Sequence, residues 1–313
     1  MDNQQITLIN DNYFAGLIDS DFGVYITMNT YKGKLNLRPR INFVNTRFEL
    51  IEACSKKLKN RDINHHVALD KATIHKDSKR IQILRLGKCI EFADAWALYS
   101  IVRRPQLELL RCFCSQRTTY VRECGWKYNN TPYTDEQKNM YEQMVLLNLN
   151  YNYDNGSRNY TFSWLAGMID GDGSIYFSET TRKCKYKQKD GTIKIYNYKK
   201  LTPWLKITTE STTALHNITE LYKKYNVRYY IDETCSKASR KLGKNKHKFY
   251  YSIVVKEFDH LMFLLNKLDG KLIGKQRQLK LMIEYIQKKK LNIHNTDDVC
   301  AIVKEVKELN NNY

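Results

Sequence analysis

The sequence Phe14-Ala-Gly-Leu-Ile-Asp-Ser-Asp21, near the start of the chain, is nearly repeated as Leu165-Ala-Gly-Met-Ile-Asp-Gly-Asp172 just past its middle. Each copy joins an apolar helical turn and a small Ala-Gly step to two carboxylates at positions i and i+2. Asp21 and Asp172 are 151 residues apart (172 − 21) in a chain of 313 residues. This spacing predicts a duplicated domain whose halves meet at the two helices and bring one acid each to a shared centre.

The small residues and the acids of this motif predict different things. Ala and Gly allow two helices to cross closely, so packing is their expected role. Carboxylates at a helix C-terminus face the negative end of the helix dipole, and a second pair nearby adds repulsion. A divalent cation would offset both effects, and Mg²⁺ binds through one or two carboxylates plus substrate phosphates. Metal-dependent hydrolysis of a phosphodiester is therefore the first function to test.

One alternative for the second motif is a calcium-binding loop, because Asp170-Gly-Asp-Gly-Ser174 is similar to the start of one. Such a loop needs Gly at its sixth position and Glu at its last, where this chain has Ile175 and Thr181. A single Asp-Gly-Asp-Gly is more typical of a plain turn. Because the motif occurs twice, each time before a predicted hairpin, we interpret it as a functional pair.

The composition predicts a polyanionic partner. The chain has 52 Lys and Arg against 33 Asp and Glu, a formal charge of +19, and no basic amphipathic helix typical of membrane surfaces stands out. The eight cysteines lack the spacing of a zinc site, and without a signal peptide at Met1 we expect reduced thiols. No apolar run has transmembrane length. The abundance of Lys, Asn, Tyr and Ile matches AT-rich codons, which favours an organellar genome (mitochondrion or chloroplast) or a phage.

Both halves predict the same order of elements. A helix ending at Asp19 or Asp170 precedes two strands, a helix, two more strands and two helices. In the first half the last strand is expected at Arg80–Leu86 and the next helix opens at Glu91, as its counterpart opens at Glu257. The first strand of the second half is expected at Ile175–Ser178. The second half has the longer first hairpin, strongly basic around Lys189. Residues 135–147 predict one helix in the polar connector, and residues 297–309 predict a final amphipathic helix.

At these residues the chain resembles the double-motif LAGLIDADG homing endonucleases. The resemblance covers both halves, approximately residues 10–116 and 160–287. It implies an α+β fold in which two pseudo-symmetric αββαββα halves pack on paired motif helices, and two four-stranded antiparallel sheets form a DNA-binding saddle. The expected division is residues 1–125, a connector at 126–159, and residues 160–313.

The resemblance also implies roles for individual residues. Asp21 and Asp172 would bind Mg²⁺, with Mn²⁺ as a substitute, and Asp19 and Asp170 would be structural. The other expected catalytic residues are basic residues that open the last helix and polar residues that end the second strand: Lys275, Arg103, Asn45 and Thr209. In one departure from the family pattern, Phe22 stands where Gly173 follows the second acid pair, and we expect it to add bulk near a scissile phosphate.

The predicted activity is a double-strand break in a long asymmetric DNA site, made by a monomer and promoting intron mobility. Outward-facing strand residues and the basic hairpin are the expected DNA contacts: Asn36, Arg38, Arg40, Lys206 and Thr208, with Lys185, Lys187 and Lys189. Two alternatives keep the same fold, namely a maturase that binds intron RNA and a DNA-binding relative that does not cleave. Retention of both acids favours cleavage over either alternative.

Overall fold

The computed structural model describes residues 9–31, 33–71, 76–125, 131–149, 156–188, 192–236, 248–291 and 297–311. The elements before the connector are α1 (Asp11–Asp21), β1 (Phe22–Tyr31), β2 (Lys34–Asn45), α2 (Phe48–Lys59), β3 (His66–Asp70), β4 (Ser78–Ile83), α3 (Leu86–Trp96) and α4 (Arg104–Glu123). The later elements are α5 (Asp135–Leu149), α6 (Phe162–Asp172), β5 (Gly173–Lys187), β6 (Ile193–Thr209), α7 (Thr212–Lys224), β7 (Tyr230–Ser236), β8 (Lys248–Val255), α8 (Phe258–Leu268), α9 (Gln276–Lys290) and α10 (Asp297–Asn311).

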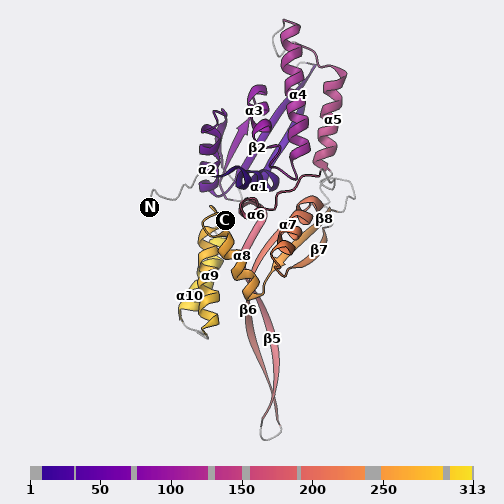
Figure 1. Cartoon of the computed structure of the whole chain (residues 1–313). Helices are drawn as coiled ribbons and strands as arrows, with labels where there is room; N and C mark the ends of the chain where they lie inside the picture. The colour runs from indigo at the N-terminus through magenta and orange to yellow at the C-terminus, as the bar shows by residue number, and fades with distance from the viewer. Residues whose placement is uncertain are drawn as a thin grey trace.

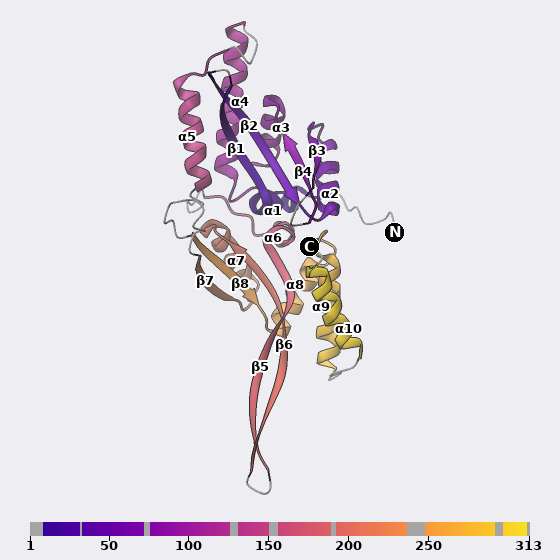
Figure 2. The same cartoon turned by 180° about the vertical axis from the view of Figure 1, so that it is seen from behind.

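Two antiparallel sheets with matching topology form the framework. Their strand orders are β1-β2-β4-β3 and β5-β6-β8-β7. The two orders are the same when the strands of each half are numbered from its own first strand. Figures 1 and 2 show the sheets on opposite sides of the central pair α1 and α6, with the chain extended along the direction of the long hairpins. This arrangement confirms the predicted α+β fold with two four-stranded sheets in the described residues.

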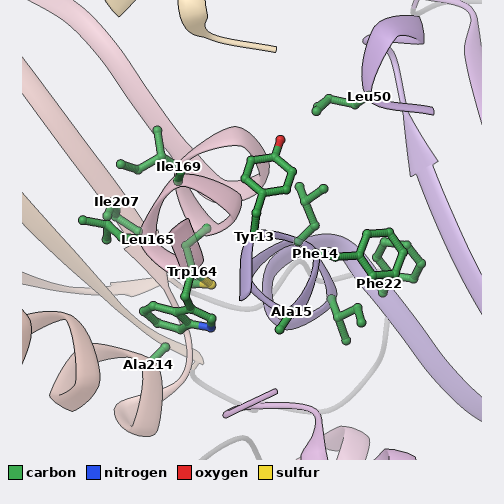
Figure 3. Close-up of a cluster of buried hydrophobic side chains, with 14 of the residues drawn as sticks. Tyr13, Phe14, Ala15, Phe22, Leu50, Trp164, Leu165, Ile169, Ile207 and Ala214 are labelled. Carbon is green, nitrogen blue, oxygen red and sulfur yellow. The ribbon is translucent and has the colours of Figure 1, made fainter. Parts of the chain in front are cut away.

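The motif helices cross backbone to backbone. A Cβ atom added to Gly16 would lie 2.1 Å from the carbonyl oxygen of Trp164, and one added to Gly167 would lie 2.1 Å from that of Tyr13. Neither position has room for a side chain, so glycine is required at the crossing. Around it, Phe14 of α1 points toward Phe22 in the first half, and Leu165 of α6 points toward Ile207 in the second half (Figure 3).

Both motif helices begin with a side-chain cap. Asn10 accepts a hydrogen bond from the backbone N–H of Tyr13 at 2.8 Å, and Thr161 accepts one from Trp164 at 3.2 Å. These caps satisfy backbone donors that the first helical turn leaves without intrahelical partners. The start of each helix is therefore fixed locally.

Phe22 lies in the core rather than on the surface that the substrate was expected to approach. Its side chain is fully buried and stacks on Phe43 with ring centroids 4.6 Å apart. It also meets the ring of Phe14 edge-on at 5.4 Å. The expectation that Phe22 adds bulk near a phosphate is wrong, because the first residue of β1 points into the core of the first half, toward Phe14 of α1 and Phe92 of α3.

Some predicted boundaries also differ from the observed ones. The strand expected to reach Leu86 ends at Ile83, and α3 begins at Leu86, five residues before the expected start at Glu91. The expected strand Ile175–Ser178 extends as β5 to Lys187. The turn of this hairpin, with Lys189, lies outside the described residues. Among the described helices, none combines the length and apolar character needed to cross a membrane.

Candidate functional site

The second acids of the two motifs meet where α1 and α6 end. Asp21 is the last residue of α1 and Asp172 is the last residue of α6. A Cβ atom added to Gly171 would lie 3.2 Å from the carboxyl carbon of Asp21, so the end of α6 lies directly against that side chain. The helix crossing thus places one carboxylate from each half in a shared site, as the repeat predicts.

Both carboxylates have raised pKa values. Burial raises the pKa of Asp21 to about 6, against the opposing effects of Lys275 and of a hydrogen bond from Asn45. Loss of hydration raises the pKa of Asp172 to about 7, and the negative charge of Asp21 adds to that shift. The Asp172 residue still has an exposed surface, so solvent screens part of this effect. The site favours protons or a cation over two bare negative charges.

The first acids of the motifs are bound inside the protein. Asp19 accepts backbone N–H groups of Ile101, Val102 and Arg103 at 2.8–3.0 Å, the Ser100 hydroxyl at 2.5 Å and the indole N–H of Trp164 at 2.9 Å. It therefore links α1 to the loop before α4 and, through Trp164, to the second half.

The equivalent acid of the second half, Asp170, has fewer partners. It accepts the hydroxyl of Tyr13 at 2.7 Å and the backbone N–H of Ile273 at 2.6 Å. Its other carboxylate oxygen is buried without a hydrogen bond. Asp170 thus links α6 to the loop before α9 and, through Tyr13, to the first half.

Lys275 caps the C-terminus of α6. Its buried ammonium donates to the carbonyl oxygens of Ile169 at 2.5 Å, Asp170 at 2.7 Å and Gly171 at 3.3 Å. A cation at this position is favourable because the last carbonyls of a helix lack intrahelical partners and carry negative partial charge. Burial lowers the pKa of Lys275 to about 8, although the nearby carboxylates oppose that change. The side chain lies beside the acid pair but is directed at the helix end.

The residue aligned with Lys275 in the first half is Arg103. Its backbone N–H donates to Asp19 at 3.0 Å, and its side chain is mostly buried. Its positive charge lowers the pKa of Asp172. One buried basic residue therefore lies near each end of the acid pair.

The strand-end residues Asn45 and Thr209 differ in what they contact. The amide nitrogen of Asn45 donates to Asp21 at 3.0 Å, and its oxygen accepts the backbone N–H of Arg47 at 2.8 Å. The hydroxyl of Thr209 instead accepts the backbone N–H of Ser211 at 3.1 Å. In the part of the chain that the structure describes, Asn45 is bonded to its motif acid, whereas the hydroxyl of Thr209 is bonded to Ser211 instead.

Two cavities flank the acids, each with contributions from both halves. One has a volume of about 350 Å³, and its lining includes Arg103, Asp172, Thr209, Glu210 and Tyr250. The other has a volume of about 590 Å³, and its lining includes Asn45, Arg47, Asp170, Lys206 and Lys275. The prediction from sequence missed Arg47 and Glu210. Aligning the halves would have drawn attention to both, because their counterparts Ser211 and Thr46 are uncharged.

The expected DNA contacts fall into two groups. Asn36, Arg38 and Arg40 alternate along β2 with buried residues, so they lie on the face of the sheet that no helix covers. Lys206 and Thr208 hold equivalent places on β6, between the buried Leu205, Ile207 and Thr209. We call these two surfaces the open faces of the sheets. Lys185 and Lys187 lie on the protruding part of the β5–β6 hairpin, and Lys189 lies outside the described residues.

The acid pair fits a divalent cation that takes further ligands from a substrate. Within the described ranges, no group of three or more His, Cys, Asp and Glu side chains is suited to holding a metal. Two carboxylates with raised pKa values form an incomplete ligand set of hard oxygens. Such a set suits Mg²⁺, which keeps several waters and binds substrate phosphates.

Comparison with known proteins identifies the fold. No protein-family model and no curated protein matches the sequence. Among solved structures, the LAGLIDADG homing endonuclease I-GzeII in complex with its DNA target has a TM-score of 0.63 at 12% identity, covering 96% of this chain and 97% of that one. The LAGLIDADG meganuclease I-CpaMI bound to uncleaved DNA has a TM-score of 0.64 at 12% identity, covering 96% and 98%. I-SmaMI bound to cleaved DNA gives 0.62 at 13% identity, covering 95% of each chain. The chain therefore has the fold of the LAGLIDADG homing endonucleases along nearly its whole length.

Proposed function

We propose that this protein is a site-specific DNA endonuclease that makes a metal-dependent double-strand break in a long asymmetric site. The observation that carries the proposal is the pair Asp21 and Asp172, one acid from each half, at the ends of two helices in backbone contact. Each acid directly precedes the first strand of its sheet, and the open face of that sheet carries polar and basic residues. We propose that each strand of the duplex is cut on its own side of this shared acid pair, so that each half serves one cleavage centre.

The residues of the site divide the chemistry. Asp21 and Asp172 would hold Mg²⁺, for which Mn²⁺ would substitute. The bound metal would lower the pKa of the attacking water and stabilise the leaving oxygen. Asn45 orients the carboxylate of Asp21 through their 3.0 Å hydrogen bond. Lys275 and Arg103 contribute positive charge near the two acids, where the reacting phosphate gains negative charge.

Duplex DNA is the proposed partner. Structural neighbours of this chain are complexes with DNA targets, and one, I-SmaMI bound to uncleaved DNA, was solved in the presence of calcium ions. The formal charge of +19 and the basic open faces favour the same partner here. Because the two halves differ in sequence, we propose an asymmetric site bound by a monomer.

We also propose a division of labour along the chain. Residues 1–125 and 160–313 would each bind one half of the site, and residues 126–159 would connect them. Cleavage would promote mobility of the intron that encodes the protein, in an organellar or other AT-rich genome. The abundance of Lys, Asn, Tyr and Ile, which have AT-rich codons, supports this last proposal.

A selection experiment tests the proposed function. The protein is incubated with a randomised duplex library and Mg²⁺, and the cut ends are sequenced. The native protein is compared with Asp21→Asn, Asp172→Asn and the control Glu142→Gln, which alters an exposed acid on α5. We expect selective double-strand cuts from the native protein and the control, and none from either Asn variant.

Two outcomes would contradict the proposal. Cleavage that persists in both Asn variants would exclude the shared two-acid centre. An absence of cutting on any duplex, together with tight binding to a structured intron RNA, would favour a maturase with the same fold.

A further inference from the structure

The protruding part of the β5–β6 hairpin is an element that the first half lacks. In the first half β1 and β2 have 10 and 12 residues, whereas β5 and β6 have 15 and 17. From Glu179 to Lys187 every residue of β5 is exposed. Where this exposed part begins, Glu179 forms an ion pair with Lys307 of α10 at 3.3 Å. We call residues 179–187 and 193–201 the ribbon. It extends away from the centre along the long direction of the molecule (Figures 1 and 2).

The ribbon has the charge of a polyanion-binding surface. Residues 181–200 include eight Lys and Arg and a single acid, Asp190. Lysines on a bare strand pair also oppose edge-to-edge aggregation, but charges of either sign would serve that purpose. Large side chains are also exposed, including Tyr186 at 64% and Ile195 at 58%. A surface of this charge and exposure indicates a nucleic-acid partner.

The register shows which side of the ribbon continues the open face. β5 and β6 pair without a bulge from Gly173 to Lys187, so residues alternate strictly between the two faces. Arg182 and Tyr186 therefore lie on the same side as Tyr176, whose partner is Trp204. Lys183, Lys185 and Lys187 lie on the opposite side of the ribbon.

The length of the ribbon matches one turn of DNA. Nine residues of strand span about 30 Å at ~3.3 Å per residue, and one turn of B-DNA measures about 34–36 Å. A two-stranded ribbon fits the major groove of B-DNA. The major groove of an RNA duplex is too narrow and deep for this, so the geometry favours DNA.

We propose, on the basis of the proposed function, that the ribbon binds the major groove of the DNA flanking the target site. It would lengthen the footprint by about one helical turn, on the side of the second half only. Arg182 and Lys194 would face base edges, and the long side chains of Lys183, Lys185 and Lys187 would reach backbone phosphates.

Footprinting tests this proposal. The variant Lys183→Gln/Lys185→Gln/Lys187→Gln is compared with Lys56→Gln/Lys59→Gln/Lys280→Gln, which removes the same charge from exposed positions on α2 and α9. Each protein binds a duplex carrying the selected site and 30-bp flanks (a length chosen as about three turns) in Ca²⁺. We expect a one-sided extension in the native protein and the control. The ribbon variant should lose it, and the slope of log K against log salt should fall by about 2–3.

The possible results distinguish a failure of the ribbon proposal from a failure of the proposed endonuclease function. A footprint that is equally long on both sides, or one that the ribbon variant leaves unchanged, would overturn the proposal. So would a ribbon variant that weakens binding to structured RNA but not to duplex DNA. If no duplex is cut, the proposed function fails, and the salt titration on a random-sequence duplex still tests the ribbon.

A second, independent observation concerns Arg47, which precedes α2. The equivalent residue of the second half, Ser211, caps its helix by accepting the N–H of Ala214 at 3.2 Å. Arg47 makes no such cap, although a missing cap costs a helix about 1 kcal/mol. Its buried guanidinium instead crosses between the halves and donates to the carbonyl oxygen of Gly274.

Arg47 thereby connects two parts of the site. Its backbone N–H holds the side chain of Asn45, which in turn binds Asp21. Gly274 precedes Lys275, the cap of the helix that ends in Asp172. A Cβ atom on Gly274 would lie 2.9 Å from the Arg47 side chain, so the contact is tight.

We infer that Arg47 is a positioning residue for one of the two cleavage centres, the one served by Asn45 and Lys275. This inference also rests on the proposed function. Replacing Arg47 with Met keeps the backbone N–H that holds Asn45 but removes the guanidinium bond to Gly274. It should therefore loosen the loop before Lys275 against the helix that Asn45 precedes, while leaving the open faces intact. One DNA strand should then be cut more slowly than the other, with kcat reduced and KM unchanged.

Strand-resolved kinetics on an end-labelled duplex tests this inference. We expect Arg47→Met to accumulate a nicked intermediate, with the slow strand cut at least tenfold more slowly, and Arg47→Lys to recover part of the rate. Ile51→Val, in the core of the same helix, controls for lost stability. Equal slowing of both strands by Arg47→Met, as expected from destabilisation alone, would overturn the inference. A native protein that cuts neither strand would instead contradict the proposed function.

Discussion

At the end of α6, the carboxylate of Asp172 has lost hydration and lies beside that of Asp21. Both effects disfavour its charged form, so the metal-free protein should become less stable as pH rises. The pKa of Asp172 is raised from 3.8 to about 7 in the fold. A raised pKa means that the protonated fold is favoured, so the stabilisation is complete below about pH 4 and lost as pH rises through about 7. Asp172→Asn cannot ionise and should keep that stability.

The matching measurement is thermal unfolding in EDTA between pH 4 and 9. At pH 8 we expect the free energy of unfolding of Asp172→Asn to be about 1 kcal/mol higher than that of the native protein. This value is discounted for the exposure of the residue. The difference should shrink toward pH 4. Glu142→Gln on α5 serves as the control, and a difference that is constant with pH would contradict the expected repulsion.

Lys275 should affect stability as well as catalysis. Its ammonium satisfies three carbonyl oxygens at the end of α6, two of them within 2.7 Å. Replacing it with Met removes this donor from all three, although the carbonyl oxygen of Ile169 keeps another donor, the backbone N–H of Gly173. We expect the loss to cost about 2–3 kcal/mol. We expect urea unfolding to show this loss in Lys275→Met and a smaller one in Lys280→Met, an exposed position on the same helix α9. Equal stability of the two variants would show that the cap is unimportant.

At the scale of the elements, the crossing of α1 and α6 should be intolerant of a single added methyl group. A Cβ atom at Gly16 or Gly167 would lie 2.1 Å from a backbone oxygen of the other helix, which only separation of the helices relieves. Gly16→Ala should therefore destabilise the protein by about 3 kcal/mol, at the upper end of overpacking effects.

Gly87, in α3, provides the matched control. A Cβ atom there meets nothing within 4 Å, and Ala favours a helix over Gly by about 1 kcal/mol. Urea unfolding should show Gly87→Ala to be neutral or stabilised. A Gly16→Ala variant as stable as Gly87→Ala would mean that the helices do not cross in backbone contact.

The repeat predicted the order of the elements because each half has to bury the apolar faces of the same helices and strands. It was less informative where local pattern and pairing disagree. The start of α3 was expected at Glu91, by analogy with Glu257, but buried Cys89, Phe92, Ala93 and Trp96 define a helix that begins earlier. The length of β5 and β6 could not be predicted, because polar strands without a covering helix lack the alternation of apolar residues that marks a half-buried strand.

The site shows the same division. Asp21 and Asp172 could be located from the sequence because both carboxylates are part of the repeated motif. The contacts of Asn45, Arg47 and Lys275 depend on how the halves dock, which sequence periodicity does not specify. Phe22 was misplaced for the same reason, because its direction is set by the pleat of β1 against Phe43.

At the scale of the whole molecule, neither half should be stable alone. The interface contains buried polar contacts between the halves, such as the bond from Trp164 to Asp19 and that from Tyr13 to Asp170. Separating the halves would expose the apolar motif helices and leave these groups without partners. We expect residues 1–159 and 160–313, expressed separately, to aggregate or remain partly unfolded by gel filtration and circular dichroism. Their co-expression should restore a folded heterodimer, and two independently folded halves would contradict the expectation.

The glycine crossing also has a consequence for how such a protein can diversify. Because Gly16 and Gly167 press each backbone against the other, the separation of the two acids is a constant of the scaffold rather than a product of adjustable side chains. Under the proposed function, residues on the open strands could therefore change, and with them the recognised DNA sequence, without altering the spacing between the two cuts. The crossing fixes the distance between the two acids, so designs that change residues on the open faces should keep Gly16 and Gly167.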